Sequence, residues 1–180
     1  MAFRMWRKAI LLSLREKKIF TVFTLIYTIL IFLTSFFINL GFQGELGEMA
    51  WTFVWIFFGT SLFLSLLYAW ILVSRKRRVW ATFKCIGYTN KNILVLVSGM
   101  IFFTTIIGFF IVIEVLFHYA AAIAYLNQTP LDLQLTILVD LMPVVFTSFI
   151  FVGVQLVAFF VAYRKVLKVR PIIALKKVGE

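Results

Sequence analysis

The sequence is poor in charge. Only 14% of its 180 residues are Asp, Glu, Lys or Arg, whereas 63% are hydrophobic. A soluble globular domain carries about 25% charged residues. A chain of this length could bury a core, but its Leu, Ile, Val and Phe supply more apolar surface than that core could hold. Lipid must be the solvent for most of this surface, so the sequence predicts an integral membrane protein.

The sequence also lacks a cysteine framework and a nucleotide-binding motif. Cys85 is the only cysteine, so no disulfide framework exists. No glycine is followed at the required distance by Gly-Lys-Ser or Gly-Lys-Thr, the P-loop pattern that cradles phosphates. We therefore expect no ATP hydrolysis by that route in this chain, and we predict no enzyme activity, cofactor or metal for it.

The charges that are present lie in blocks. The net charge is +11, and the eighteen basic residues form three groups of six, within residues 4–18, 75–91 and 164–177. A nucleic-acid-binding protein presents a basic surface on a folded polar domain, and this chain has no such domain. No nucleic-acid partner is predicted. Acidic residues lie in the gaps, and loops rich in Lys and Arg stay cytoplasmic. The alternation therefore predicts four crossings of the cell membrane with both termini in the cytoplasm.

Four apolar runs meet the roughly 20-residue length of a membrane-spanning helix. The predicted crossings lie at about residues 19–40, 51–73, 93–118 and 137–163. Ahead of them, residues 2–18 predict an amphipathic interfacial helix whose apolar face carries Phe3, Trp6, Ile10 and Leu14. Residues 164–180 would form a cytoplasmic tail. The fold class is all-α, with one four-helix transmembrane domain over 1–180, and Pro143 predicts a kink in the fourth crossing.

A basic, amphipathic segment, residues 74–93, separates the second and third crossings. Read as a helix from Arg75, it has one apolar stripe at helical spacing, formed by Val79, Phe83 and Ile86. Gly87 is a natural helix stop, and Thr89 with Asn90 can cap the helix that follows. A signal for membrane topology alone would need only charge. The stripe and the glycine favour a short helix on the membrane surface, with its apolar face offered to a partner.

Glu114 and His118 lie one helical turn apart and are compatible with a proton or metal site. Glu114 is 21 residues from Ile93, about 32 Å along a helix, which places it near the outer interface. Water can reach a carboxylate there, and two ligands on one helix do not make a metal site. We therefore interpret the two residues as a solvated or hydrogen-bonded polar pair.

Three parts of the chain resemble the FtsX-like permease family, the MacB or LolC/LolE type of ABC transporter subunit. The first is the basic signature after the second crossing, with Arg77, Arg78, Ala81, Thr82, Phe83, Lys84 and Gly87, ending at Ile93. The second is a terminal pattern formed by Pro171, Ala174, Leu175 and Lys176. The third is the basic segment ahead of the first crossing, Leu12 to Lys18. Their order and spacing among four crossings carry the likeness.

The resemblance implies a pair of permease chains, identical or not, that works with two cytoplasmic ABC ATPases. Those ATPases would bind ATP and Mg. It also implies a coupling helix at roughly Arg75 to Ile86 that docks on the ATPase. The coupling residues carried over are Arg75, Arg78, Val79, Phe83, Lys84, Ile86 and Gly87. The tail motif carried over is Pro171, Ala174 and Leu175.

The chain departs from the family pattern in two places. Val79 stands where the family usually carries an acidic residue, so one polar contact with the ATPase is missing or replaced. Only about ten residues, 41–50, join the first two crossings, where the family usually inserts a large extracellular domain. The substrate-binding or adaptor-docking part is therefore absent, supplied by another chain, or unnecessary.

Three functions remain open on the sequence. The first is a permease subunit that moves or extracts an amphiphile such as a lipid, a hydrophobic peptide or a drug, or that transmits a mechanical signal across the membrane. The second is a small ATP-independent multidrug or proton-coupled carrier, which would need a buried acid at the midplane. The third is a non-transporting membrane regulator. Only the first predicts a stoichiometric ATPase partner.

Overall fold

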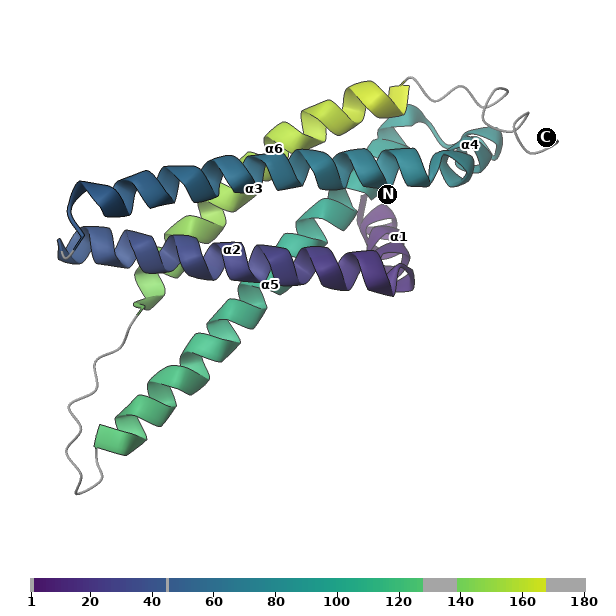
Figure 1. Cartoon of the computed structure of the whole chain (residues 1–180). Helices are drawn as coiled ribbons and strands as arrows, with labels where there is room; N and C mark the ends of the chain where they lie inside the picture. The colour runs from purple at the N-terminus through teal and green to yellow at the C-terminus, as the bar shows by residue number, and fades with distance from the viewer. Residues whose placement is uncertain (1, 45, 128–138, 168–180) are drawn as a thin grey trace. The chain divides into compact units, whose positions relative to one another are not determined.

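The computed structural model describes residues 2–44, 46–127 and 139–167, and within these ranges all regular structure is helical (Figure 1). The helices are, in chain order, α1 (Ala2–Arg15), α2 (Lys17–Gln43), α3 (Glu48–Arg75), α4 (Arg77–Cys85), α5 (Asn90–Asn127) and α6 (Leu141–Leu167). Helices α1 and α4 are short, and α2, α3, α5 and α6 are long.

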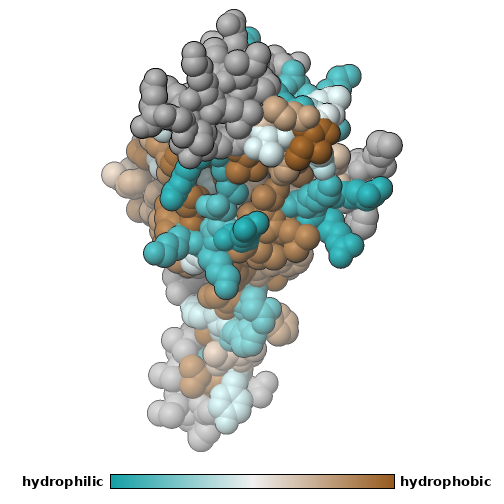
Figure 2. Space-filling model, turned by 90° about the vertical axis from the view of Figure 1, so that its right-hand side faces the viewer, coloured by the Kyte–Doolittle hydropathy of each residue, from teal (hydrophilic) through white to brown (hydrophobic). Residues whose placement is uncertain are grey.

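Three of the long helices, α2, α3 and α5, are apolar and long enough to cross a membrane. Helix α6 contains a shorter apolar stretch, Leu141–Val157. Large hydrophobic side chains, among them Ile29, Trp55 and Phe149, are exposed on these helices. Figure 2 shows such residues at the surface beside hydrophilic ones. Exposure on this scale is expected where the surrounding solvent is lipid, and the predicted all-α membrane class is confirmed.

Pro143 does not interrupt a helix. Helix α6 begins at Leu141, so Pro143 is in its first turn. The first four N–H groups of a helix have no partner within it, and a proline there removes no hydrogen bond. The described residues just before Leu141, 139 and 140, are not helical, so the kink that the sequence predicted within the fourth crossing is wrong.

The chain divides into two compact units, and unit 1 comprises the described residues of Met1–Phe23, Leu62–Thr104 and Gly153–Glu180. In unit 1, α1 and α5 meet at small residues, since a Cβ on Gly99 would lie 2.8 Å from the Cβ of Ala9. Tyr68 of α3 packs on Phe23 of α2, with ring centroids 4.2 Å apart. The Tyr68 hydroxyl lies 3.0 Å from that of Thr104 in α5. Close packing and a buried hydrogen bond thus join four helices.

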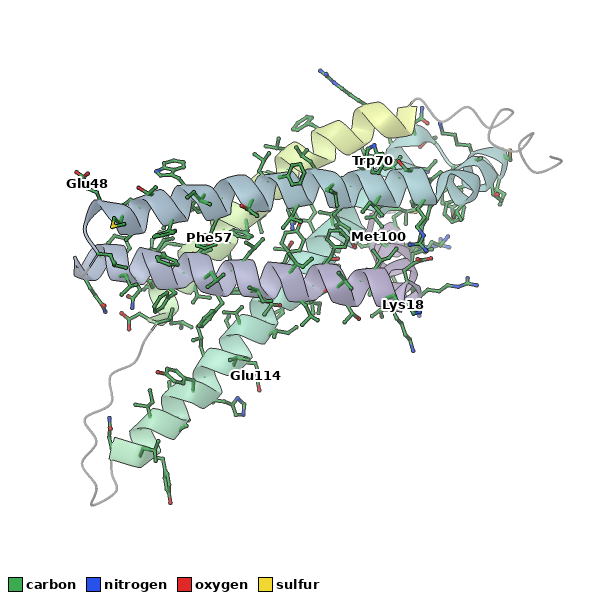
Figure 3. The ribbon with its side chains drawn as sticks, in the orientation of Figure 1. Lys18, Glu48, Phe57, Trp70, Met100 and Glu114 are labelled. Carbon is green, nitrogen blue, oxygen red and sulfur yellow. The ribbon has the colours of Figure 1, made fainter. Side chains whose placement is uncertain are left out.

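Unit 2 comprises the described residues of Thr24–Ser61 and Thr105–Val152. Here α2 and α3 form an antiparallel hairpin (Figure 1). Its turn contains Gly44 and Gly47, whose positive φ angles suit glycine. Phe37 of α2 packs on Phe57 of α3, with ring centroids 5.6 Å apart (Figure 3). The Ser35 hydroxyl of α2 donates to the Thr147 hydroxyl of α6 over 3.1 Å, which gives the hairpin a polar contact with a third helix.

Candidate functional site

Helix α4 is a separate element because the chain breaks on both sides of it. One residue, Lys76, separates it from α3, and Gly87 ends it with φ of 95°. The N–H of Tyr88 donates to the carbonyl of Phe83 over 2.9 Å, and the N–H of Gly87 donates to the carbonyl of Lys84 over 3.1 Å. These two bonds, with glycine in the left-handed conformation, form a Schellman motif. The helix stop predicted at Gly87 is confirmed and has a defined geometry.

Trp80 fixes α4 to the rest of unit 1, and the sequence reasoning missed it. Its side chain is fully buried, and its Nε1–H donates to the carbonyl of Leu72 over 3.4 Å. Leu72 lies in the last turn of α3, whose carbonyls have no partner within the helix. Three aromatic rings form a row that starts at Trp80. The centroid of the Phe83 ring lies 6.0 Å from that of Trp80 and 5.1 Å from that of Tyr88.

The predicted coupling residues fall into different environments. Val79 and Ile86 are 37% and 69% exposed, while Phe83 is half-buried within the aromatic row. The three therefore do not form one uniform apolar surface. Arg75 is exposed, and Lys84 is half-buried, which lowers the pKa of its ammonium group by desolvation. The side chain of Arg78 and the tail residues Pro171, Ala174 and Leu175 lie outside the described part of the chain.

Two polar contacts connect the residues that flank α4 with α1 and with the junction between α1 and α2. The Lys8 ammonium of α1 donates to the Tyr88 hydroxyl over 2.6 Å. Lys76, whose side chain is 9% exposed, lies 3.5 Å from the carboxylate of Glu16. Burial lowers the pKa of Lys76, and the charge of Glu16 opposes that effect. Both ends of α4 are thus held against α1 or its junction with α2.

The start of α5 completes this region. The Thr89 hydroxyl accepts a hydrogen bond from the N–H of Asn92 over 3.3 Å, which is an N-cap. Thr89 directly follows Tyr88, so the connection between α4 and α5 contains both a helix stop and a helix start. The cap predicted at Thr89 is confirmed.

Glu114 and His118 lie far from α4 in the chain, in unit 2. Their carboxylate and Nδ1 atoms are 3.6 Å apart, and the two side chains are more than two-thirds exposed. Nδ1 of His118 also lies 2.9 Å from the carbonyl oxygen of Glu114, and Figure 3 shows Glu114 pointing outward from α5. Among the residues whose placement is described, no three His, Cys, Asp or Glu side chains gather as metal ligands would. The arrangement is an exposed polar pair.

The comparisons with known proteins bear on α3 to α6. Residues 51–171 match the family described as FtsX-like permease, C-terminal. The chain belongs to the FtsX-like permease family. Neither the curated proteins nor the solved structures gave a match to it. The matched residues begin in the first turn of α3 and include all of α4, so the region around Trp80 lies inside the family domain, whereas α1 and α2 lie before it.

FtsX-like permeases are membrane components of ABC transporters and generally work with cytoplasmic ABC ATPases. The family domain is a transmembrane component and is generally not itself catalytic. Helix α4 is a short helix with a hydrogen-bonded C-terminal cap. Its Trp80 side chain is buried, whereas Val79 and the adjacent Ile86 are exposed and could contact a partner.

Proposed function

We propose that this chain is the membrane-spanning subunit of an ABC transporter and that α4 is its coupling helix. In this proposal a separate ATPase binds ATP and Mg and moves α4 during its cycle. The movement drives the extraction or transfer of an amphiphile, such as a lipid, a hydrophobic peptide or a drug, or a mechanical signal across the membrane.

One observation carries the proposal: α4 lies within the family domain, is anchored by the buried Trp80, and leaves Val79 and the neighbouring Ile86 exposed. The buried Trp80 side chain and its hydrogen bond to the Leu72 carbonyl restrain α4 relative to α3, so a force on α4 would be passed to that helix. Ile86, the C-cap residue of α4, is the most exposed apolar residue of this segment. This exposed apolar side chain is two residues from Lys84, and such a pair suits a groove with an acidic edge, because charges at the rim set orientation and association rate.

The proposed topology has four crossings with both termini in the cytoplasm. The positions of the basic groups support it, since two of them flank α2 at its start and α3 at its end. Helix α5 is 38 residues long, about 57 Å, which is more than a 30 Å hydrocarbon slab requires. In this topology the surplus turns of α5 extend beyond the outer interface, and Glu114 lies near that interface.

The exposure of Glu114 also weighs against an ATP-independent carrier. A proton-coupled carrier needs an acid buried near the midplane, where desolvation holds its proton until exchange. Glu114 is the single acid described within the matched part of α5, and its side chain is 73% exposed. The permease proposal needs no titrating group inside the membrane.

The test is purification from native membranes in a mild detergent, with the mass of the complex measured. We expect two permease chains, identical or paired with a relative, and two ABC ATPase chains. An active complex that contains one permease chain, or that lacks any ATPase, would contradict the proposal. Labelling of sealed cells provides an independent check on topology, because Cys85 is exposed in the structure and should react only after the membrane is opened.

A further inference from the structure

The charged side chains described in unit 1 are all cationic, with one exception. The exposed basic side chains among its described residues are Arg4, Arg7, Lys8, Arg15, Lys17, Lys18, Arg75, Lys91 and Arg164. The single acid described in this unit, Glu16, already pairs with the buried Lys76. No described carboxylate is therefore left to neutralise the exposed cations, and this surface favours a polyanionic partner.

Helix α1 presents three different faces. Ala9 and Ser13 are buried, and Ala9 meets Gly99 of α5 so closely that this face is closed to any partner. At 100° per residue, a second face carries Trp6, Ile10 and Leu14, and Trp6 and Leu14 are exposed. The third face carries Arg4, Lys8 and Arg15, all of them exposed. The apolar face that the sequence predicted is therefore buried only in part, since Trp6 and Leu14 are exposed and Ile10 is half-buried.

The position of α1 in the chain decides what covers these two faces. Only one residue, Glu16, separates α1 from α2, and α2 is apolar and long enough to enter the membrane. The end of α1 must therefore lie at the level where α2 leaves the hydrocarbon. A helix at that level with an apolar face beside a basic face matches a bilayer surface: the apolar side chains enter the boundary of the acyl chains, and the cations meet the headgroup phosphates.

We infer that α1 docks on the anionic phospholipids of the leaflet next to it, with Trp6, Ile10 and Leu14 in the acyl boundary and Arg4 and Arg15 on the phosphates. This docking also positions α4. Lys8 of α1 binds the Tyr88 hydroxyl, and Glu16 binds Lys76 at the other end of α4. A change in the charge of the leaflet thus reaches the segment between α3 and α5 through two contacts.

The experiment measures the depth of α1 in the full-length chain. A nitroxide label is placed at Leu14→Cys in a Cys85→Ser background, and the chain is reconstituted into vesicles of phosphatidylcholine alone or mixed with phosphatidylglycerol. Accessibility to oxygen and to a water-soluble nickel chelate reports depth. A label at Ile29→Cys, an exposed position in the middle of α2, serves as the reference for hydrocarbon.

Charge variants separate lipid attraction from simple partitioning. Each cation near an anionic surface changes the docking equilibrium by about fivefold, so the double variant Arg4→Gln/Arg15→Gln should lose about 25-fold. The matched control Arg164→Gln/Lys91→Gln removes two exposed cations that are not on α1. We expect the Leu14 label to move toward water in phosphatidylcholine alone and in the α1 variant, but not in the control.

Two results would overturn the inference. If the label has the same depth in both vesicle compositions and in all variants, α1 is held by its packing on Gly99 and its apolar face alone. If the label is shielded from oxygen and from the chelate in the mixed vesicles, a protein surface covers this face instead of lipid. Protein yield and the Ile29 reference identify variants that fail to insert, and the Leu14 readings are compared only among inserted chains.

Discussion

The carboxylate of Glu16 and the ammonium of Lys76 lie 3.5 Å apart, and each residue is the one residue between two helices. Glu16 separates α1 from α2, and Lys76 separates α3 from α4. The ion pair therefore joins two changes of chain direction that are 60 residues apart in sequence. Lys76 is buried, so its charge depends on this partner more than a surface lysine would.

The first prediction concerns the loss of this partner. Glu16→Gln leaves a buried ammonium without its counterion, and an unpaired buried group costs about 1–3 kcal/mol or more when charged. We expect the lower half of this range, because the Glu16 side chain is 37% exposed and partly screened by water. The free energy of unfolding of the purified chain in mixed micelles is the measurement.

Glu114→Gln is the matched control, since it removes the same charge from an exposed pair and should change the unfolding free energy by less than about 0.5 kcal/mol. The double variant Glu16→Gln/Lys76→Met should recover stability relative to Glu16→Gln, because no charge is then buried alone. Equal effects of Glu16→Gln and Glu114→Gln would show that the junctions do not depend on the pair.

The second prediction is the pH dependence that Lys76 causes. Burial lowers its pKa in the folded chain below the ordinary value of 10.5, and Glu16 opposes that shift. Between the folded pKa and 10.5, the unfolded chain binds more protons at this site than the folded chain. The free energy of unfolding should therefore rise with pH in this window, and the cost of the buried charge is present in full below it.

Lys76→Met removes this titration while the half-buried Lys84 keeps its own, so the difference between the two pH profiles isolates Lys76. We expect a flatter alkaline profile in Lys76→Met than in the unchanged chain. Glu16→Gln should extend the rise to lower pH, because the interaction that raises the pKa is gone. Parallel profiles for the unchanged chain and Lys76→Met would refute the assignment.

Local signals of helix ends could be predicted from the sequence. Gly87 and Thr89 act through the backbone of their own neighbours, and the structure has a Schellman motif and an N-cap at these positions. The membrane class was equally accessible, since it follows from composition. The helix ends depend on a few neighbouring residues and the class on overall composition, and tertiary packing alters neither.

Which face of a short helix packs on the protein could not be predicted. On α4, periodicity selected Val79, Phe83 and Ile86, but the buried anchor is Trp80, one residue away from that stripe. On α1, it selected Trp6, Ile10 and Leu14, yet the buried residues are Ala9 and Ser13. Periodicity identifies an apolar face, whereas close helix contact selects small residues and lipid can cover the large ones.

The third prediction tests the contact between α1 and α5. Gly99→Ala would place a methyl group 2.8 Å from the Cβ of Ala9, nearer than carbon atoms can approach. Overpacking of this kind typically costs about 1–3 kcal/mol, and we expect it to lower the unfolding free energy and loosen α1. Ala9→Gly in the same chain should restore most of the loss, because the pair then has its original volume.

Gly59→Ala is the control for a glycine within a helix. A Cβ at Gly59 would have no described atom within 4 Å. Alanine has the higher helix propensity, by about 0.8–1 kcal/mol in water, so Gly59→Ala should leave the protein equally or more stable. A loss at Gly59 as large as that at Gly99, or no rescue by Ala9→Gly, would argue against a steric contact.

The last prediction separates the docking face of α4 from its anchor. Ile86 is 69% exposed, so Ile86→Ser removes little packing within the chain, but it removes the apolar group proposed to enter the ATPase. Interface anchors typically contribute 2 kcal/mol or more, about a 30-fold loss of affinity. Phe83→Ala is a poorer probe, because Phe83 also stacks on Tyr88 and its loss would disturb α4 itself.

Retention of the ATPase at matched membrane levels is the measurement for each variant. Cys85→Ser, at an exposed position one residue before Ile86, should retain the ATPase fully. Trp80→Phe removes the donor to the Leu72 carbonyl and should lower the stability of the permease, with loss of ATPase only in proportion to the misfolded fraction. If Ile86→Ser and Val79→Ser retain the ATPase while Arg75→Gln loses it, α4 binds its partner by charge, and the apolar face serves another purpose.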